Sequence, residues 1–193
     1  MRVKFGRELM LACSIIFLIS LLSAKTSFLF IRDTSGALKF NLEPIKSLLD
    51  TYAYTIIAAV GMTLVIIAGQ IDLSVGSTLA VCSLVAGYAA LAGMPIPLVA
   101  LLAILVGAVI GCVNGIIVAW GRIHSIIVTL GTMNLLRGLI LLVTKQEWLY
   151  PPDSFKYLGR VAFQGFPLPV WMAVVVVLIA AFFVKNTRTG REI

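Results

Sequence analysis

Residues 61–81 read GMTLVIIAGQIDLSVGSTLAV, an apolar run that a short polar group interrupts before the run resumes. Within this stretch Asp72 is the only acidic residue found between Asp50 and Glu147. A carboxylate in such surroundings is costly in lipid unless it lies at a membrane face, at a helix end or in a cavity lined by protein. The stretch therefore predicts two apolar helical segments joined by a capped turn or by a break inside the membrane.

The residues of this break are small or polar, which suits a bent backbone. Glycine permits the bend, and side-chain oxygens can accept hydrogen bonds from the amides that the bend frees. The segment lies either at the cytoplasmic face or within the membrane, and the sequence leaves both open. The residues predicted to form the break and to shape a path beside it are Gly69, Gln70, Asp72, Ser74, Gly76 and Ser77.

The amino-acid composition indicates whether the chain lies in water or in a membrane. Hydrophobic residues make up 61% of the 193 residues, charged residues make up 12%, and the mean hydropathy is +1.08. Soluble domains contain about 25% charged residues. A chain this apolar cannot cover itself with polar surface in water, so the sequence predicts an integral membrane protein.

The net charge of +7 does not indicate a nucleic-acid-binding surface. The basic residues cluster before the first apolar run, in the Arg122 turn and after the last run, as expected for flanks held on the cytoplasmic side. We therefore predict that both termini are cytoplasmic. Cys13, Cys82 and Cys112 lie inside apolar runs, and His124 is the only histidine, so the sequence predicts no metal site and no cofactor.

Six apolar runs approach the length of a membrane span, which is about 20 residues for a helix. Mixed-charge or aromatic loops connect them, including residues 32–50 and the loop from Lys145 to Pro169. The fold class predicted is all-α, a polytopic membrane protein with about six transmembrane helices and a helix break at Gly69–Ser77, in one domain over residues 1–193. The predicted spans are Leu9–Phe30, Tyr52–Ala68, Thr78–Ala92, Leu98–Trp120, Ile126–Val143 and Val170–Val184.

Two sets of residues stand out inside the later spans. Gly107, Gly111 and Gly115 recur every four residues, which predicts a helix face that packs closely against another helix. Polar residues at membrane depth form the second set, and they are either helix-to-helix hydrogen-bonding groups or contributors to a solute pathway. These candidate pathway residues are Asn114, Thr129, Gly131, Thr132 and Asn134.

The ordered motifs resemble a known family. Residues 61–66 with 71–77, Asn114-Gly115, residues 126–132 and Arg137-Gly138 are similar to the signatures of permease subunits of ATP-binding-cassette sugar importers. The family type is that of ribose, xylose, arabinose, rhamnose and autoinducer-2 permeases. This chain departs from the usual pattern at Gln70, His124 and Ser125. Such permeases usually continue beyond the point where this chain ends, so we expect an incomplete N-terminal portion of a longer permease.

The resemblance implies a subunit of the bacterial inner membrane that provides the path for a sugar or a sugar-like solute. It implies that a separate ATPase subunit hydrolyses ATP, that a periplasmic sugar-binding protein delivers the solute, and that a second permease subunit completes a homo- or heterodimer. Two other classes stay open. A non-transporting membrane scaffold or remnant is one, and an intramembrane enzyme is the other, with Asp72 and His124 as its only candidate catalytic pair.

Overall fold

The computed structural model describes residues 13–14, 17–18, 20–21, 30–32, 38–153, 155, 161–188 and 190. The chain divides into two compact units, residues 1–51 and residues 52–193, and each is described by itself. The predicted span Leu9–Phe30 falls mostly outside the described residues. The single-domain arrangement over residues 1–193 remains a prediction.

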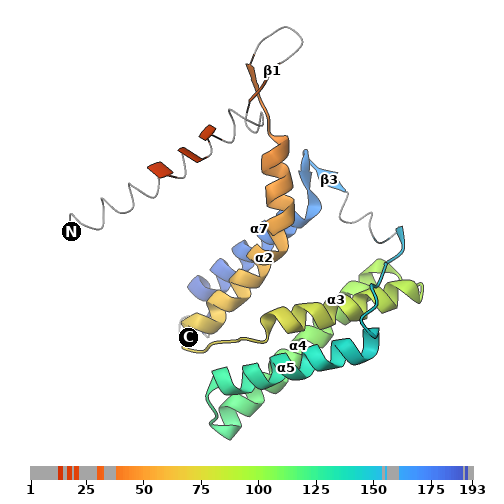
Figure 1. The fold of residues 1–193 in the computed structure, drawn as a ribbon. Coiled ribbons are helices and arrows are strands. Elements are labelled where there is room, and N and C mark those ends of the chain that lie inside the picture. Colours follow the sequence, from red (N-terminus) through yellow and green to blue (C-terminus); the bar gives the residue numbers. More distant parts are fainter. Residues whose placement is uncertain are drawn as a thin grey trace, which may run out of the picture. The chain divides into compact units, whose positions relative to one another are not determined.

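The N-terminal unit contains a short hairpin and the start of a long helix. Strand β1 (Phe30–Arg32) pairs antiparallel with β2 (Leu38–Phe40), and Phe30 lies opposite Phe40. Helix α2 (Glu43–Ile67) follows at once (Figure 1). Its first amide donates to the Asn41 side chain at 3.2 Å, and Lys46 pairs with Glu43 at 2.8 Å. These contacts explain why the helix begins at residue 43, within residues 32–50, which the sequence predicted to be a loop with room for a surface helix.

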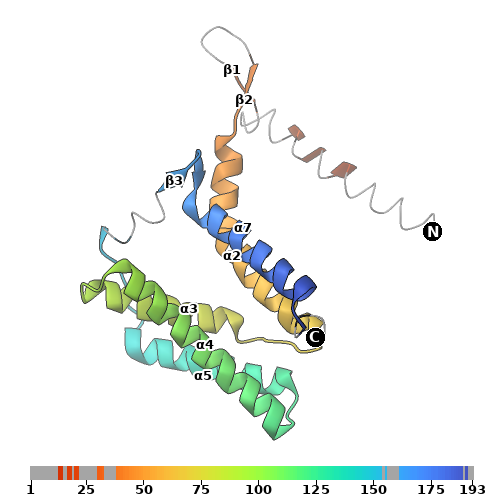
Figure 2. The same cartoon turned by 180° about the vertical axis from the view of Figure 1, so that it is seen from behind.

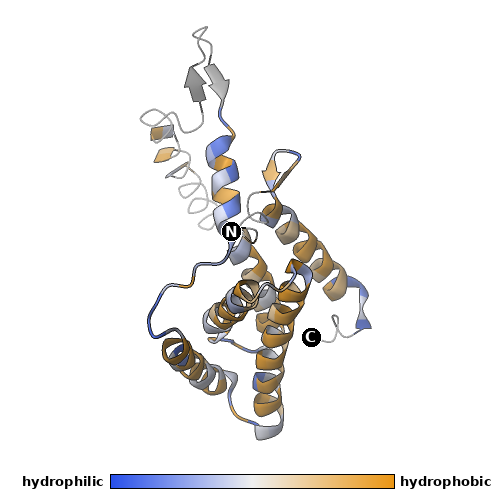
Figure 3. Ribbon diagram, turned by 90° about the vertical axis from the view of Figure 1, so that its right-hand side faces the viewer, coloured by the Kyte–Doolittle hydropathy of each residue, from blue (hydrophilic) through white to orange (hydrophobic). Residues whose placement is uncertain are grey.

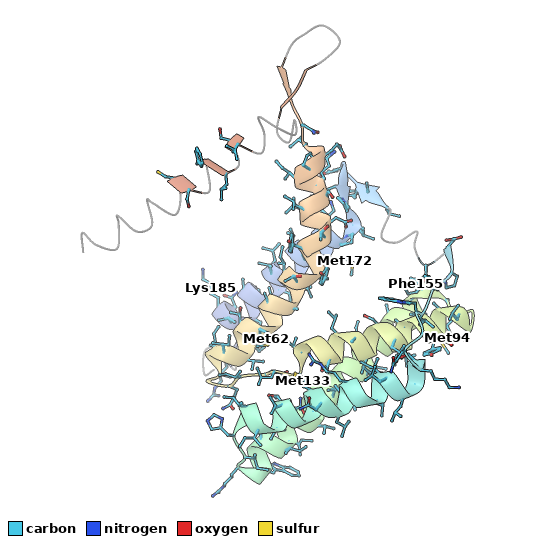
Figure 4. The ribbon with its side chains drawn as sticks, viewed as in Figure 1. Met62, Met94, Met133, Phe155, Met172 and Lys185 are labelled. Carbon is cyan, nitrogen blue, oxygen red and sulfur yellow. The ribbon has the colours of Figure 1, made fainter. Side chains whose placement is uncertain are left out.

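In the second unit, three consecutive helices form a bundle. Helices α3 (Val75–Leu91), α4 (Ile96–Gly121) and α5 (Ser125–Thr144) lie side by side in both views (Figures 1 and 2), and α3 contacts both of the others. Tight turns connect them. Gly93 has a φ of 78° in the first turn, where Figure 4 marks Met94, and Arg122 has a φ of 50° in the second.

The bundle buries few side chains, and most of its large apolar side chains face outward. Val81, Val99, Val128 and Leu136 are among the buried apolar residues. Leu142, by contrast, is 79% exposed, and Ile104 is 67% exposed. In water such surfaces would drive aggregation, but in lipid they are the expected exterior. Figure 3 shows the apolar residues covering the helices along their length.

The aromatic loop after α5 contains a second hairpin. Strands β3 (Ala162–Phe163) and β4 (Phe166–Pro167) pair through Gln164 and Gly165, whose φ angles are 50° and 78°. The Trp171 indole donates to the Phe163 carbonyl at 3.0 Å, and the two rings meet edge to face. The hairpin thus anchors the start of α7 (Leu168–Asn186), which ends near Lys185 (Figure 4).

Helices α2 and α7 of this unit line an apolar pocket of about 420 Å³. Residues 57–64 of α2 and residues 176–183 of α7 line it.

Four of the described helices are long and apolar enough to cross a membrane, namely α2, α4, α5 and α7, and α3 is shorter at 17 residues. The chain is therefore a polytopic α-helical membrane protein. The sequence predicted about six transmembrane helices, whereas the described residues contain five labelled helices. The all-α prediction also missed the two hairpins, because their strands are only two or three residues long and carry no period-2 pattern to recognise.

Candidate functional site: a polar break held by two helices

The backbone leaves the helical path between α2 and α3, over residues 68–74, and this segment is called the break below. Gly69 has a φ of 72°, a conformation that glycine adopts without steric cost. The amides of Gly69 and Gln70 close the end of α2 by donating to the Ile66 and Val65 carbonyls at 2.9 and 3.0 Å. A glycine therefore ends the helix where the sequence predicted a bend.

The break is shorter than the predicted segment Gly69–Ser77. Helix α3 begins at Val75, and the Thr78 amide already donates to the Ser74 carbonyl at 2.8 Å. Gly76 and Ser77 consequently lie in the first turn of α3. Ser77 is 3% exposed, and its hydroxyl has no hydrogen-bond partner among the described residues.

The Asp72 carboxylate organises the C-terminal end of the break. Its Oδ1 accepts two hydrogen bonds from Ser74, one from the amide at 2.7 Å and one from the hydroxyl at 2.6 Å. Two donors on one oxygen fix the turn that leads into α3. Asp72 thus accepts an amide that the break frees.

Ser74 continues this bonding into the neighbouring helices. The Asn114 amide on α4 donates to the Ser74 hydroxyl at 3.1 Å, and the Thr132 hydroxyl on α5 donates to Asn114 Oδ1 at 2.6 Å. Asp72, Ser74, Asn114 and Thr132, called the polar chain below, therefore join the break to α4 and α5. The side-chain hydrogen bonds of the polar chain all run in one direction: Thr132 donates to Asn114, Asn114 donates to Ser74, and Ser74 donates to Asp72.

Helix α5 also holds the backbone of the break directly. The Ile71 amide donates to the Ser125 hydroxyl at 3.1 Å, and the Leu73 amide donates to the Thr129 hydroxyl at 3.1 Å. Thr129 in turn donates to the Ser125 carbonyl at 2.8 Å. Residues four apart lie on one face of a helix, at about the spacing of two residues in an extended backbone. The Ser125 and Thr129 hydroxyls can therefore accept from the Ile71 and Leu73 amides at the same time.

Ser125 was not among the residues that the sequence predicted for this site. The signal that could have identified it is its four-residue spacing from Thr129, which places two hydroxyls on one face at the start of α5. Both side chains are buried, with exposures of 4% and 3%.

A pocket of about 220 Å³ opens between the break and α4. Residues of the break, the end of α2 and the start of α5 border it, and α4 contributes Asn114 and two glycines. Its lining residues are Val65, Ala68, Gln70, Ile71, Asp72, Gly111, Asn114, Gly115, Val118, Ser125 and Thr129.

The three glycines of α4 have different surroundings within the described chain, and close packing of all three against another helix stays a prediction. At Gly107 a Cβ atom would meet the Cys82 sulfur of α3 at 3.3 Å, so this glycine does permit close helix packing. At Gly111 and Gly115 a Cβ atom would meet no atom of the described residues within 4 Å. Their small size leaves the pocket open instead.

The remaining candidates lie elsewhere. Gly131 and Asn134 are on the exposed side of α5, and the Asn134 amide donates back to the Leu130 carbonyl at 3.1 Å. His124 is exposed in the turn before α5, and no hydrogen bond in the described part of the chain joins it to Asp72. Among the described residues there is also no group of three potential metal ligands.

Comparison with known proteins gives one family and several relatives. The family described as the branched-chain amino acid transport system/permease component matches residues 45–193. The chain is similar to the autoinducer 2 import system permease protein LsrC of Yersinia pseudotuberculosis serotype O:1b (strain IP 31758), with 38% identity over 155 residues. It is also similar to the LsrC proteins of Photorhabdus luminescens, with 34% identity, and of Yersinia pestis (strain Pestoides F), with 36% identity.

Each of these alignments covers 79% of the chain, but only 44% of the relative for the two Yersinia proteins and 46% for the Photorhabdus protein. The chain thus spans a little under half the length of these relatives. No solved structure matches the chain.

Proposed function

This chain belongs to the branched-chain amino acid transport system/permease component family, and we propose that it forms part of the membrane path of an ATP-driven importer. The observation that carries this proposal is the family match over residues 45–193. Permease components carry solute and leave ATP hydrolysis to another subunit, so no catalytic role is assigned to Asp72 or His124.

The break and its pocket are the section of the chain that suits a solute path. Irregular backbone at membrane depth is tolerated where it lines a cavity, and discontinuous helices of this kind mark binding sites in transporters. The residues proposed to shape the path here are Gly69, Gln70, Asp72 and Ser74 of the break, with Asn114 and Thr129 beside them. Most of their hydrogen bonds are used within the protein, so their main role is to hold the shape of the pocket.

The solute is proposed to be a sugar or a sugar-like molecule. The relatives from Yersinia and Photorhabdus are named as autoinducer 2 import permeases, and the amide, carboxylate and hydroxyl groups beside the pocket suit a hydroxylated solute. A pocket of about 220 Å³ is small, which favours a compact solute over a large one.

The proposed partners follow from the same assignment. They are an ATP-binding-cassette ATPase subunit, a periplasmic binding protein and a second permease subunit, which is either a second copy or a different chain. The proposed location is the bacterial inner membrane with both termini in the cytoplasm. The Arg122 turn lies on the cytoplasmic side in this arrangement, and the break lies toward the same side.

A chimeric permease tests the proposal. The matching N-terminal half of LsrC from Yersinia pseudotuberculosis is replaced by this chain, and the chimera is produced with the ATPase subunit of that importer. We expect the chimera to reach the membrane, to co-purify with the ATPase and to support its ATP hydrolysis in liposomes. Autoinducer 2 uptake in a strain that lacks LsrC then shows whether the solute is shared.

Two controls make the result decisive. Unmodified LsrC gives the positive reference, and a chimera that carries Leu in place of both Asp72 and Asn114 tests whether the break is required. A chimera that is produced at the normal level but does not associate with the ATPase would argue for the scaffold class. Association without uptake would keep the permease assignment and reject autoinducer 2 as the solute.

A further inference from the structure

Helix α5 presents two different faces, and only one of them contacts the rest of the described chain. Ser125, Val128, Thr129 and Leu136 are buried against the break and the neighbouring helices. The opposite side carries four small or polar residues in the middle of an otherwise apolar helix. These are Gly131, Asn134, Arg137 and Gly138, called the outer polar face below, and all four are exposed.

The outer polar face lies at membrane depth. Asn134 stands nine residues after Ser125 and ten before Thr144, at the centre of the 20-residue helix. At a rise of about 1.5 Å per residue it is roughly 14 Å from either end. Figure 4 marks the adjacent Met133 in the central part of α5.

Neither polar side chain of this face has the partners expected for a position in lipid. The Asn134 amide donates only to the Leu130 carbonyl of its own helix. Arg137 makes no hydrogen bond and no ion pair with any described residue. An ionisable residue within a membrane span normally faces the interior of a bundle or a water-filled cavity. Both side chains therefore need a polar environment that the described chain does not supply.

Arg137 alone could extend its long side chain toward the headgroups, because it lies about two turns from the end of α5. Asn134 is one turn deeper, and its side chain is too short to reach them. No atom of the described residues lies within 4 Å of a Cβ placed at Gly131 or Gly138, so the surface beside these side chains is open. A water-filled space beside the helix would satisfy both residues at once.

We propose that the outer polar face borders the water-filled solute path and that Arg137 selects against cations in favour of neutral hydroxylated or anionic solutes. The inference rests on the proposed function only in assigning the water to a solute path. A guanidinium donates up to five hydrogen bonds to hydroxyl, carboxylate or phosphate oxygens and repels ammonium groups. The outer polar face lies on the side of α5 opposite the hydroxyls beside the break, so it borders a different section of the path from the pocket.

Cysteine accessibility in inner-membrane vesicles tests the first part. The full chain carries Asn134→Cys in a background where Cys13, Cys82 and Cys112 are replaced by alanine. Two methanethiosulfonate reagents are used, an anionic sulfonate reagent for this step and a cationic quaternary ammonium reagent for comparison in the next. Leu135→Cys is the matched control, because Leu135 lies at the same depth, is 66% exposed and points about 100° away around the helix. We expect reaction at residue 134 and at least tenfold slower reaction at residue 135.

The second part is tested with reagents of opposite charge. At Asn134→Cys, the rate with an anionic sulfonate reagent is divided by the rate with the cationic reagent. Residues three apart on a helix are neighbours, so Arg137→Gln should lower this ratio by roughly fivefold, whereas Arg137→Lys should preserve it. The same ratio at Tyr150→Cys, in the loop after α5, should not change.

Each alternative occupant gives a different result. Absence of labelling at residue 134, or equal labelling at residues 134 and 135, would overturn the water-filled path. A disulfide between two copies at residue 134 would mean that a second helix covers the face, and an unchanged ratio in Arg137→Gln would remove the selective role. These results are independent of the chimera experiment. Labelling at residue 134 without ATPase association of the chimera would reject the permease role and keep water at the outer polar face. ATPase association without labelling at residue 134 would keep the permease role and reject water at this face.

Discussion

The Asn114 amide of α4 lies 3.1 Å from the Ser74 hydroxyl, a hydrogen bond between residues that are forty positions apart in the chain. Because Asn114 also accepts from Thr132, one side chain connects the break to two helices. It is the central residue of the polar chain. Its removal leaves the Thr132 hydroxyl without its acceptor and the Ser74 hydroxyl with its bond to Asp72 alone.

Asn114→Ala should therefore destabilise the protein by about 1–2 kcal/mol, since interhelical hydrogen bonds in membranes are individually modest but the groups left behind here are buried. Thermal unfolding in one detergent measures the change. Asn134→Ala is the matched control, because its amide is exposed and bonds only to its own helix. An equal effect of the two substitutions would contradict the role of the polar chain.

Asp72→Asn should be tolerated, and Asp72→Leu should not. Asparagine keeps the oxygen that accepts from the Ser74 amide, whereas leucine leaves a buried donor unsatisfied at a cost of about 1–3 kcal/mol. The unfolding temperatures of both variants provide the measurement. Gln70→Leu serves as the control, since the Gln70 side chain has no hydrogen bond within the described residues. If Asp72→Leu were as stable as the parent, the break would be an ordinary solvated turn.

Thr129→Val should weaken the hold of α5 on the break. Valine has nearly the shape of threonine but offers no acceptor to the Leu73 amide, so we expect a loss of about 1–2 kcal/mol. Thr129→Ser keeps the hydroxyl and should lose less. Hydrogen exchange at the Leu73 amide gives a local readout: it should become faster in the valine variant and stay close to the parent in the serine variant.

Leucine should have opposite effects at two glycines of α4. At Gly107 it would collide with Cys82 of α3, and overpacking of this kind costs about 1–3 kcal/mol. At Gly111 it has room and would fill the pocket, so the protein should fold normally and lose pocket volume. Yield and unfolding temperature in detergent separate the two cases. Loss of folded protein at Gly111 alone would mean that another helix packs there.

The predicted orientation can be tested at the two ends of α5. His124 and Tyr150 are both exposed in the connections before and after this helix. Cysteine at position 150 should react with an impermeant maleimide in intact cells with a permeable outer membrane, and cysteine at position 124 should react only after the inner membrane is opened. The reverse pattern would place both termini outside the cytoplasm.

The position of the break could be predicted from the sequence because its signal is local. A single carboxylate between glycines in an apolar run has few places to be stable in a membrane, and the structure does end α2 before it. The predicted span began at Tyr52 and α2 begins at Glu43, because residues 43–50 mix polar and apolar side chains, which hydropathy reads as a loop or a surface helix. Hydropathy records solvent preference and not backbone conformation.

The partners of the break could not be predicted, because they depend on how distant helices are rotated. The bonds from Ser125 and Thr129 join residues 54 and 56 positions apart. The sequence marked Asn114, Thr129, Thr132 and Asn134 as polar at depth, but it could not tell which would turn inward. The structure turns the first three toward the break and leaves Asn134 outside.

The paired bonds from the backbone of residues 71 and 73 to α5 fix the register of that helix. If α5 slid by half a turn, about 2.7 Å, both amides would lose their hydroxyl partners together. We therefore expect α3, α4 and α5 to travel as one rigid body whenever the protein changes conformation. The bonds to α2 end at the Gln70 amide and the bonds to α5 begin at the Ile71 amide, so we expect α2 to swing about the linkage between these two residues.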